Sequence, residues 1–297
     1  MQIIFLGTSC AIPTKERNHS CIALRYHDEI ILFDCGEGTQ RQLKIAKLKP
    51  TKINKIFISH WHGDHVIGLL GLIQTLTMAD YNKTLHIFGP KGTKKYLNNL
   101  LHSCIADIET IKIECNEVSK GKILETSLYY IETLPLEHRC PTNGYAFIEK
   151  PKRKIKIDVI KKLGIPEGPL LGKLQSGKSI TWRGKRITPD ETTYLTKGRK
   201  VTYIADTIPC KNAFLLSKDA DVLICDSTYA SDMKEKALEY KHMTAADAAQ
   251  LASKANAKQL ILTHFSTRYK DISVLKEDAS KIFPNTIAAE DFMKITL

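Results

Sequence analysis

Four potential metal ligands lie within six residues of the chain, at His60, His62, Asp64 and His65. Imidazole nitrogen and carboxylate oxygen together suit Zn²⁺, and also Mn²⁺ or iron. Gly63 lets the loop fold back, so that His60 and His62 can face one ion while Asp64 and His65 turn toward a second. No cysteine joins the set, which argues against a closed structural zinc site.

Strand and helix patterns alternate along the whole chain around this loop. We expect strands at 2–6, 20–26, 29–33, 55–58, 84–88, 109–114, 127–133, 144–149, 200–204, 221–225, 258–262 and 285–288. We expect helices at 40–47, 68–79, 91–102, 210–217, 244–254 and 272–281. Because strands meet helices in both halves, the pattern predicts an α/β protein with helices on the outer faces of its sheets.

Other histidine and aspartate residues also come after predicted strands. His138 comes after the strand at 127–133, Asp206 after that at 200–204, and His264 after that at 258–262. Asp34 ends the strand at 29–33 and precedes a glycine-rich turn. Each of these residues, taken alone, could be an ordinary loop residue.

The charge of the 297-residue chain is concentrated in one segment. The whole chain carries 44 Lys and Arg against 32 Asp and Glu, a net charge of +12, and its 43% apolar content is that of an ordinary globular protein. Residues 150–200 carry 15 basic and four acidic side chains, whereas the rest of the chain is nearly balanced. Glycines and prolines between 164 and 177 predict an extended loop after Lys161. We interpret 150–198 as an inserted arm that meets a polyanion, the alternative being a solvated insertion that only aids solubility.

The remaining composition indicates a soluble cytoplasmic protein. The longest apolar stretch, 66–78, is interrupted by polar residues and is shorter than the roughly 18 residues of a membrane span. The N-terminal segment is expected to form the first strand and not a signal peptide. Eight cysteines without a CxxC pair predict reduced, buried thiols.

The loop His60-x-His62-x-Asp64-His65 resembles the HxHxDH motif of the metallo-β-lactamase superfamily. The resemblance covers the whole chain and implies one domain, 1–297: an αββα sandwich of two mixed sheets flanked by helices, with an inserted flexible arm. It implies two Zn²⁺ per subunit, with Mn²⁺ possible. One ion would be held by His60, His62 and His138, the other by Asp64, His65 and His264, and Asp206 would bridge them. Asp34 would accept a hydrogen bond from a ligating imidazole and fix its tautomer.

Three further segments resemble the ribonuclease Z branch of this superfamily. Its exosite arm, which binds tRNA, is similar to a pattern formed by Gly164, Pro166, Gly168, Pro169 and Gly172. Its PxKxRN loop, which handles the tRNA 3′ end, is similar to residues 13–18, including Lys15 and Arg17. Its HEAT box resembles His242-Met243-Thr244-Ala245, with Met243 in place of the glutamate.

This second resemblance implies a zinc-dependent endoribonuclease that removes the 3′ trailer from precursor tRNA. Asp64 would act as general base and His242 would protonate the departing 3′ oxygen, leaving a 3′-hydroxyl on tRNA and a 5′-phosphate on the trailer. The family's short members imply a homodimer, and neither DNA nor a membrane is expected as a partner.

Two alternatives remain open from the residues themselves. A hydrolase of small molecules, such as a phosphodiesterase or an enzyme of the glyoxalase II or arylsulfatase type, explains the ligands but not the basic segment. A non-catalytic, basic RNA-binding protein explains the charge, but it predicts an incomplete ligand set, whereas all seven positions here are filled.

Overall fold

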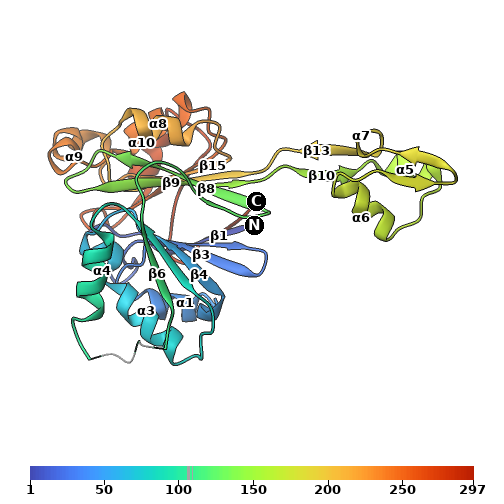
Figure 1. Ribbon diagram of the computed structural model, residues 1–297. Coiled ribbons are helices and arrows are strands. Elements are labelled where there is room, and N and C mark those ends of the chain that lie inside the picture. Colours follow the sequence, from blue (N-terminus) through green and yellow to red (C-terminus); the bar gives the residue numbers. More distant parts are fainter. Residues whose placement is uncertain (106–107, 109) are drawn as a thin grey trace. The chain divides into compact units, whose positions relative to one another are not determined.

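Two mixed sheets of seven strands each form the framework of the protein, as the computed structural model shows for residues 1–105, 108 and 110–297 (Figure 1). The first sheet consists, in spatial order, of β18 (Lys294–Thr296), β1 (Gln2–Gly7), β2 (Cys21–Tyr26), β3 (Glu29–Phe33), β4 (Ile53–Phe57), β5 (Leu85–Gly89) and β6 (Ile113–Glu117). The second consists of β17 (Thr286–Ala288), β16 (Leu260–Thr263), β15 (Val222–Asp226), β14 (Lys200–Ile204), β9 (Thr142–Glu149), β8 (Tyr129–Leu136) and β7 (Gly121–Glu125).

Aromatic side chains fill the space between the two sheets. Three ring pairs join strands of different sheets, with centroid distances of 5.1 to 5.7 Å: Phe33 with Tyr203, Phe57 with Tyr145, and Tyr26 with Phe147. All six rings are at most 3% exposed. Offset and edge-on packing of such rings stabilises a core beyond the burial of their area.

Helices cover the outer face of each sheet, which confirms the predicted αββα architecture (Figure 1). The first sheet carries α1 (Thr39–Ile45), α3 (Gly68–Thr77) and α4 (Thr93–Leu101), and the second carries α8 (Lys211–Ser217), α10 (Ala245–Lys254) and α11 (Ser273–Ser280). In α3 the buried side chains of Leu69, Leu72, Ile73 and Leu76 recur at helical spacing and pack against the first sheet. Thr244 and Asp247 form a capping box that begins α10.

Parallel strand pairs bring most of the predicted ligands to one edge of each sheet. β3, β4 and β5 are parallel in the first sheet, and β14, β15 and β16 are parallel in the second. The carboxyl ends of parallel strands meet at the same edge, so residues that directly follow them are neighbours.

The inserted unit, Thr126–Tyr130 with Ile148–Arg199, folds around a small core of its own. β10 (Lys152–Ile155) pairs with β13 (Thr193–Thr196), and between them lie α5 (Ile157–Leu163), α6 (Pro169–Gln175), the hairpin of β11 (Ile180–Trp182) with β12 (Lys185–Ile187), and α7 (Pro189–Thr192). The buried side chains of Ile160, Ile165, Leu174, Ile180 and Ile187 pack together. The expectation of an extended loop after Lys161 is therefore wrong, because these apolar residues are spread too widely for strand or helix periodicity.

Other differences from the sequence expectation concern short elements and element ends. The strand expected at 109–114 begins at Ile113, and residue 109 lies outside the described part. The patterns also missed β7, β18, α2 (Gly63–Val66) and α9 (Lys234–Tyr240), and two 3₁₀ turns, Pro50–Lys52 and Ser231–Met233. Most of these elements have five residues or fewer, too few for a periodic pattern.

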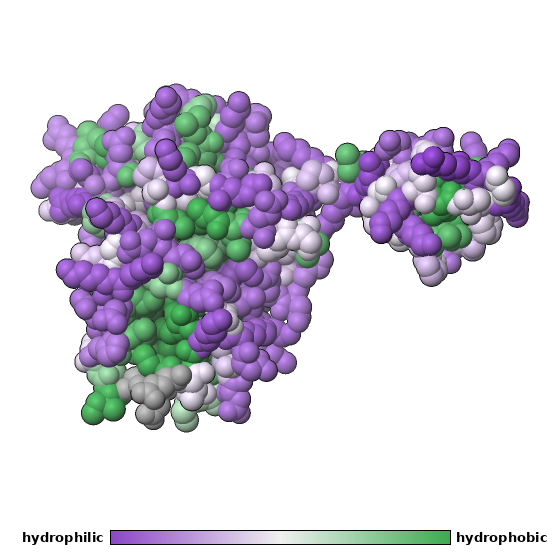
Figure 2. All heavy atoms as spheres, viewed as in Figure 1, coloured by the Kyte–Doolittle hydropathy of each residue, from purple (hydrophilic) through white to green (hydrophobic). Residues whose placement is uncertain are grey.

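No helix within the described residues is long and apolar enough to cross a membrane. Apolar side chains nevertheless gather over α3 on the face shown in Figure 2. Ile67 and Met78, at the two ends of this helix, are 51% and 86% exposed.

Gly68 allows the first turn of α3 to touch the turn that follows β3. Its N–H donates to the carbonyl of Cys35 at 3.0 Å, and a Cβ at this position would lie 1.9 Å from the carbonyl oxygen of Gly36. We expect Gly68→Ala to lower the free energy of unfolding by about 1–3 kcal/mol, because two backbone segments must separate. Gly71→Ala in the same helix is the control, since its Cβ would meet only the end of the Gln40 side chain, at 3.0 Å. Urea denaturation of both variants measures the difference, and equal midpoints would contradict the prediction.

Candidate metal centre

The loop after β4 carries His60, His62, Asp64 and His65 at the carboxyl edge of the first sheet. Gly63 is the first residue of α2, and this short helix turns Asp64 and His65 back toward the strand end. The N–H of Cys35, in the turn after β3, donates to the carbonyl of His65 at 2.8 Å. The loop is therefore held in place by backbone contacts as well as by its side chains.

The first group of ligand atoms comes from both sheets. Nε2 of His60 lies 2.9 Å from Nδ1 of His62, which lies 3.3 Å from Nε2 of His138. Oδ2 of Asp206 lies 3.5 Å from Nε2 of His60 and 3.9 Å from Nε2 of His138. One atom from each of these four residues lies within 4.8 Å of the others, so the group could hold one cation.

The second group lies beside the first. Nε2 of His65 is 3.1 Å from Nε2 of His264, and Oδ2 of Asp64 is 3.5 Å from each of them. These three residues could hold another cation. The seven residues predicted as ligands thus lie together, in the two groups that the sequence resemblance implied.

Asp206 faces both groups with different oxygen atoms. Oδ2 faces the first group, whereas Oδ1 lies 3.5 Å from Nε2 of His65 and 3.3 Å from Nε2 of His264. Asp206 is 2% exposed, and no residue in the described part of the chain donates a hydrogen bond to Oδ1. A buried carboxylate oxygen surrounded by imidazole nitrogens is the environment expected of a ligand to a divalent cation, so the residues present fit a metal.

Asp34 orients His65 from the side away from the ligand atoms. Its Oδ2 accepts a hydrogen bond from Nδ1 of His65 at 2.7 Å, which leaves Nε2 free to bind. The same carboxylate accepts hydrogen bonds from the hydroxyls of Ser59 and Tyr203, at 2.8 and 2.7 Å. Asp34 has a φ of 59°, a left-handed conformation that aspartate and asparagine tolerate better than most residues.

His138 is oriented by the backbone of the segment that carries His242. Its Nδ1 donates to the carbonyl of Lys241 at 2.9 Å, so that Nε2 faces the first group. Arg139 donates to the carbonyl of Glu239 at 2.8 Å, which ties the same loop to α9. Lys241 has a φ of 57° and ends α9. The next residue, His242, is thereby held beside the third histidine of the first group.

Sequence reasoning missed Asp226, which lies at the end of β15. Its Oδ2 is 2.9 Å from Nδ1 of His242, and its Oδ1 is 3.7 Å from Nδ1 of His264. Asp226 directly follows the strand expected at 221–225, as Asp206 follows the strand expected at 200–204, and this position at a strand end is a signal that could have found it.

His242 therefore has a carboxylate beside it although residue 243 is not a glutamate. Met243, which stands where the resemblance expects a glutamate, is fully buried, with its sulfur 3.7 Å from the thiol of Cys225. Asp226 supplies an acidic partner to His242 from another element.

The pKa values of the histidines reflect the carboxylates around them. Burial lowers the pKa of His60 and His138, which favours the neutral imidazole that a metal requires. Although burial opposes it, the carboxylates of Asp206, Asp64 and Asp34 raise the pKa of His65 to about 9. The same three carboxylates that favour a proton on His65 would also attract a metal cation to this site.

His242 has a raised pKa for a similar reason. Although burial opposes the shift, the carboxylates of Asp226 and Asp206 raise the pKa of this imidazole above its ordinary value. Its ring is 5.2 Å from that of His138 and 5.4 Å from that of His264, between centroids, so it lies at the edge of the ligand groups.

The loop at residues 13–18 contacts the centre, but its two basic residues differ. The N–H of Ala11, just before this loop, donates to Oδ2 of Asp64 at 2.7 Å. Lys15 is exposed. Arg17 is only 8% exposed, and its Nη2 donates to the carbonyl of Tyr269 at 2.8 Å, so Arg17 joins two loops of the main unit.

The residues of the predicted exosite pattern lie on the surface of the inserted unit. Gly164 ends α5 with a φ of 60°, Gly168 precedes α6 with a φ of 138°, and Pro169 is the first residue of α6. Pro166 and Gly172 are exposed as well, and a Cβ on Gly172 would meet no atom within 4 Å. The glycines and prolines of this pattern therefore lie at exposed positions in α6 and in the segment that joins α5 to α6.

Asp34→Asn tests the role of the carboxylate behind His65. Asparagine keeps the left-handed backbone but removes the charge, so we expect zinc affinity to fall by about 10–100-fold. Competition with a chromophoric chelator measures the affinity. Asp28→Asn is the control, because Asp28 is an exposed carboxylate paired with Lys52 and should leave zinc binding unchanged. Equal affinities for the two variants would show that Asp34 does not support the centre.

Comparisons with known proteins agree with this geometry. Residues 1–157 match the family model described as anti-Pycsar protein Apyc1, and residues 174–265 match the beta-lactamase superfamily domain. Ribonuclease Z of Archaeoglobus fulgidus is 42% identical over 298 residues, covering 99% of this chain and 97% of the relative. Ribonuclease Z of Methanosarcina mazei is 40% identical over 300 residues, with coverage of 99% and 97%. The crystal structure of the short form of human tRNase Z, 27% identical, superimposes with a TM-score of 0.74 over 100% of this chain and 99% of that one. The chain belongs to the ribonuclease Z family of the metallo-β-lactamase superfamily.

Proposed function

We propose that this protein is an endoribonuclease that removes the 3′ trailer from precursor tRNA, using two divalent cations, most simply Zn²⁺. The observation that carries the proposal is the position of Asp206, with one carboxylate oxygen facing each of two ligand groups. Together the groups offer five imidazoles and two carboxylates, a donor set that suits zinc, with Mn²⁺ as the alternative.

The bound cations would activate the water, and side chains of the protein would transfer the protons. Two bound cations would lower the pKa of an attacking water and stabilise negative charge on the phosphoryl oxygens. Asp64, whose Oδ2 already accepts the N–H of Ala11, would accept the proton of that water as general base. Burial opposes the shift, but His65 and His264 lower the pKa of Asp64, so the carboxylate is ionised.

His242 would act as the general acid. Its Nδ1 is held by Asp226 at 2.9 Å, so the proton on Nε2 is the one available to the departing 3′ oxygen. The two neighbouring carboxylates raise its pKa and so favour the imidazolium form that can donate. The products would be a tRNA with a 3′-hydroxyl and a trailer with a 5′-phosphate.

The inserted unit would bind the tRNA through its positive charge. Its exposed cations without an ion pair among the described residues are Lys154, Lys161, Lys162, Lys173, Lys178, Arg183, Lys185, Arg186 and Lys197. Such a cluster binds the phosphate backbone of a nucleic acid with little regard to sequence. Lys15 would contact the RNA near the centre, whereas the buried contact of Arg17 with Tyr269 would shape the loop.

We also propose that two copies associate, so that the arm of one copy serves the centre of the other. The exposed apolar side chains of Ile67 and Met78 on either end of α3 would be covered by such an association. We place the protein in the cytoplasm, because all eight cysteines are free and tRNA precursors are a cytoplasmic substrate.

Two variants separate chemistry from recognition. Asp64→Ala should abolish single-turnover cleavage of a precursor tRNA with little change in tRNA affinity, because it removes the base and a ligand. Replacement of residues 152–195 by a short glycine–serine linker should weaken tRNA binding and its salt dependence, while hydrolysis of bis(p-nitrophenyl) phosphate continues. Unchanged tRNA affinity of the shortened protein at several salt concentrations would exclude the arm as the binding surface.

The same two variants also test the association in pairs. Mixed dimers of Asp64→Ala with the shortened protein contain one intact arm and one intact centre in different copies. Such mixtures should recover cleavage that neither variant shows alone. A small-molecule hydrolase would instead cleave the p-nitrophenyl ester or a thioester without inhibition by tRNA, and a non-catalytic RNA-binding protein would cleave nothing at any metal content.

Asp226→Asn tests how His242 is activated. Removing the charge should lower the rate of tRNA cleavage by about tenfold or more, since proton donation contributes about 10²–10⁴-fold to such reactions. Hydrolysis of bis(p-nitrophenyl) phosphate should change little, because p-nitrophenolate departs without a proton. A parallel loss of both activities would mean that Asp226 supports the ligands, through His264, and not the general acid. His242→Asn should show the same selective loss as Asp226→Asn.

A further inference from the structure

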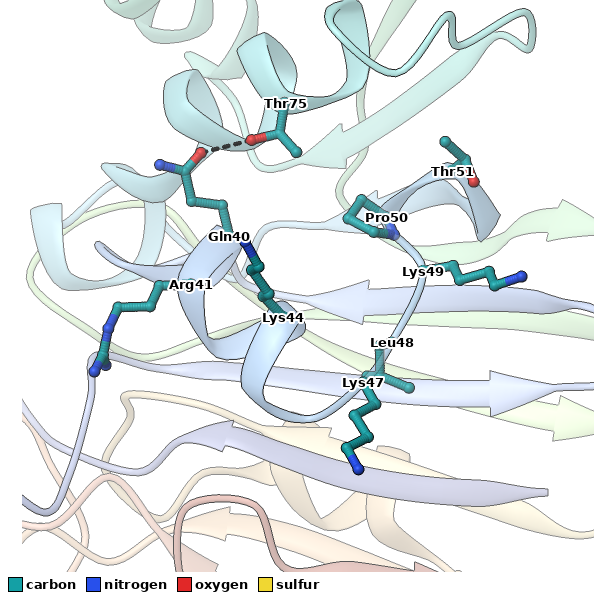
Figure 3. A pocket seen from close by; sticks show the side chains of 9 residues that line it. All are labelled: Gln40, Arg41, Lys44, Lys47, Leu48, Lys49, Pro50, Thr51 and Thr75. Carbon is teal, nitrogen blue, oxygen red and sulfur yellow. Dashed lines mark hydrogen bonds between the residues drawn. The ribbon is translucent and has the colours of Figure 1, made fainter.

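A surface hollow of about 720 Å³ lies on the main unit beside α1 (Figure 3). α1 and the segment after it supply four cations to its wall, Arg41, Lys44, Lys47 and Lys49, and no carboxylate is among the described residues that line it. Thr75 of α3 closes the other side, where its hydroxyl donates to Oε1 of Gln40 at 2.7 Å.

The four cations of this hollow are exposed and uncompensated. Within the part of the chain that the structure describes, none of them forms an ion pair or a side-chain hydrogen bond. Their neighbours differ, because Lys52 pairs with Asp28 at 2.5 Å and Lys55 with Glu29 at 2.6 Å. Outside residues 150–200 basic and acidic side chains are nearly equal in number, so this local excess does not follow from the composition of the main unit.

The spread of the charges indicates an extended anion. In Figure 3 the charged ends of Arg41, Lys47 and Lys49 point in different directions from α1 and the following segment, and do not converge on one point. A single phosphate or a free nucleotide is best held by converging donors, whereas a chain of phosphates is matched by cations that follow one another along a surface.

In the sequence, the residues that line the hollow begin six positions after Asp34 of the metal centre. Asp34, which orients His65, is followed by the turn that leads into α1, and Arg41 and Lys44 lie within this helix. A seven-residue helix is about 10 Å long, so the cations extend from the neighbourhood of the centre along the outer face of the first sheet. An RNA strand that leaves the centre in this direction would meet them in succession.

We propose that this hollow is a second binding surface for the phosphate backbone of the substrate RNA, separate from the inserted unit. The inference rests on the proposed function, since it takes precursor tRNA as the polyanion. Binding would be electrostatic and insensitive to base sequence, because exposed Lys and Arg side chains contact phosphate oxygens, which are the same for every base.

The test compares two variants of the full-length protein that lose the same charge. The first is Arg41→Gln/Lys44→Gln/Lys47→Gln/Lys49→Gln, and the control is Lys120→Gln/Lys254→Gln/Lys276→Gln/Lys294→Gln, at exposed lysines elsewhere on the main unit. The Kd for precursor tRNA is measured between 50 and 200 mM salt. Solution mass and hydrolysis of bis(p-nitrophenyl) phosphate are measured for both.

We expect the first variant to bind tRNA about tenfold or more weakly and its salt slope to fall by about 2–4, with solution mass and ester hydrolysis unchanged. Equal Kd values and slopes for the two variants would overturn the inference. Dissociation of the first variant alone into monomers would also overturn it, since the hollow would then lie between copies. Cleavage of tRNA by the unaltered protein tests the proposed function, whereas only the difference between the variants tests the hollow.

Discussion

The burial of Asp206 between five imidazoles is the interaction on which the rest of the structure depends. A carboxylate that is 2% exposed and has an oxygen without a hydrogen-bond donor among the described residues is costly unless positive charge faces it. Asp64, Asp34 and Asp226 add further negative charge within the same region, and histidines alternate with them. Such an arrangement is stable when cations or protons balance it, and cations are the better match to oxygens and nitrogens that point toward common centres.

Three residues that carry or orient the predicted ligands have a strained, left-handed backbone conformation. Asp34, Lys241 and His264 have φ values of 59°, 57° and 64°, and each such left-handed residue costs of order 1–3 kcal/mol. Surrounding contacts hold them there: Asp34 by Ser59 and Tyr203, and Lys241 through its carbonyl bond to His138. The aromatic layer between the sheets provides the rigid support for these positions, because Tyr203 belongs both to that layer and to the hydrogen bonds of Asp34.

In the proposed function, catalysis and RNA binding depend on different parts of the chain and on different kinds of interaction. The centre is buried and depends on short-range geometry, so small displacements of a ligand alter it. The cations of the inserted unit and of the hollow beside α1 are exposed, and in the proposed function they would act through longer-range, salt-sensitive attraction. This division explains how a chain whose main unit is nearly neutral carries a net charge of +12.

The layered α/β fold could be predicted from the alternation of strand and helix patterns, and the seven ligands could be predicted from the resemblance of the sequence motifs to the metallo-β-lactamase superfamily. Asp34 was found through the same resemblance, whereas Asp226 was missed, because the resemblance expects a carboxylate at position 243, next to His242 in the sequence. Partnership with an imidazole depends on distance in space, and only the fold brings the end of β15 to the start of α10.

The amino-acid sequence by itself determined which residue types occupy the strand ends and where the positive charge lies along the chain. The tertiary structure alone decided that the inserted segment has its own core and that Arg17 is buried against Tyr269 while Lys15 is exposed. It also decided that four cations near α1 form no ion pair with any residue that the structure describes. The physical reason is that periodicity and spacing report local backbone geometry, whereas burial and charge compensation depend on residues that are distant in sequence and become neighbours only after folding.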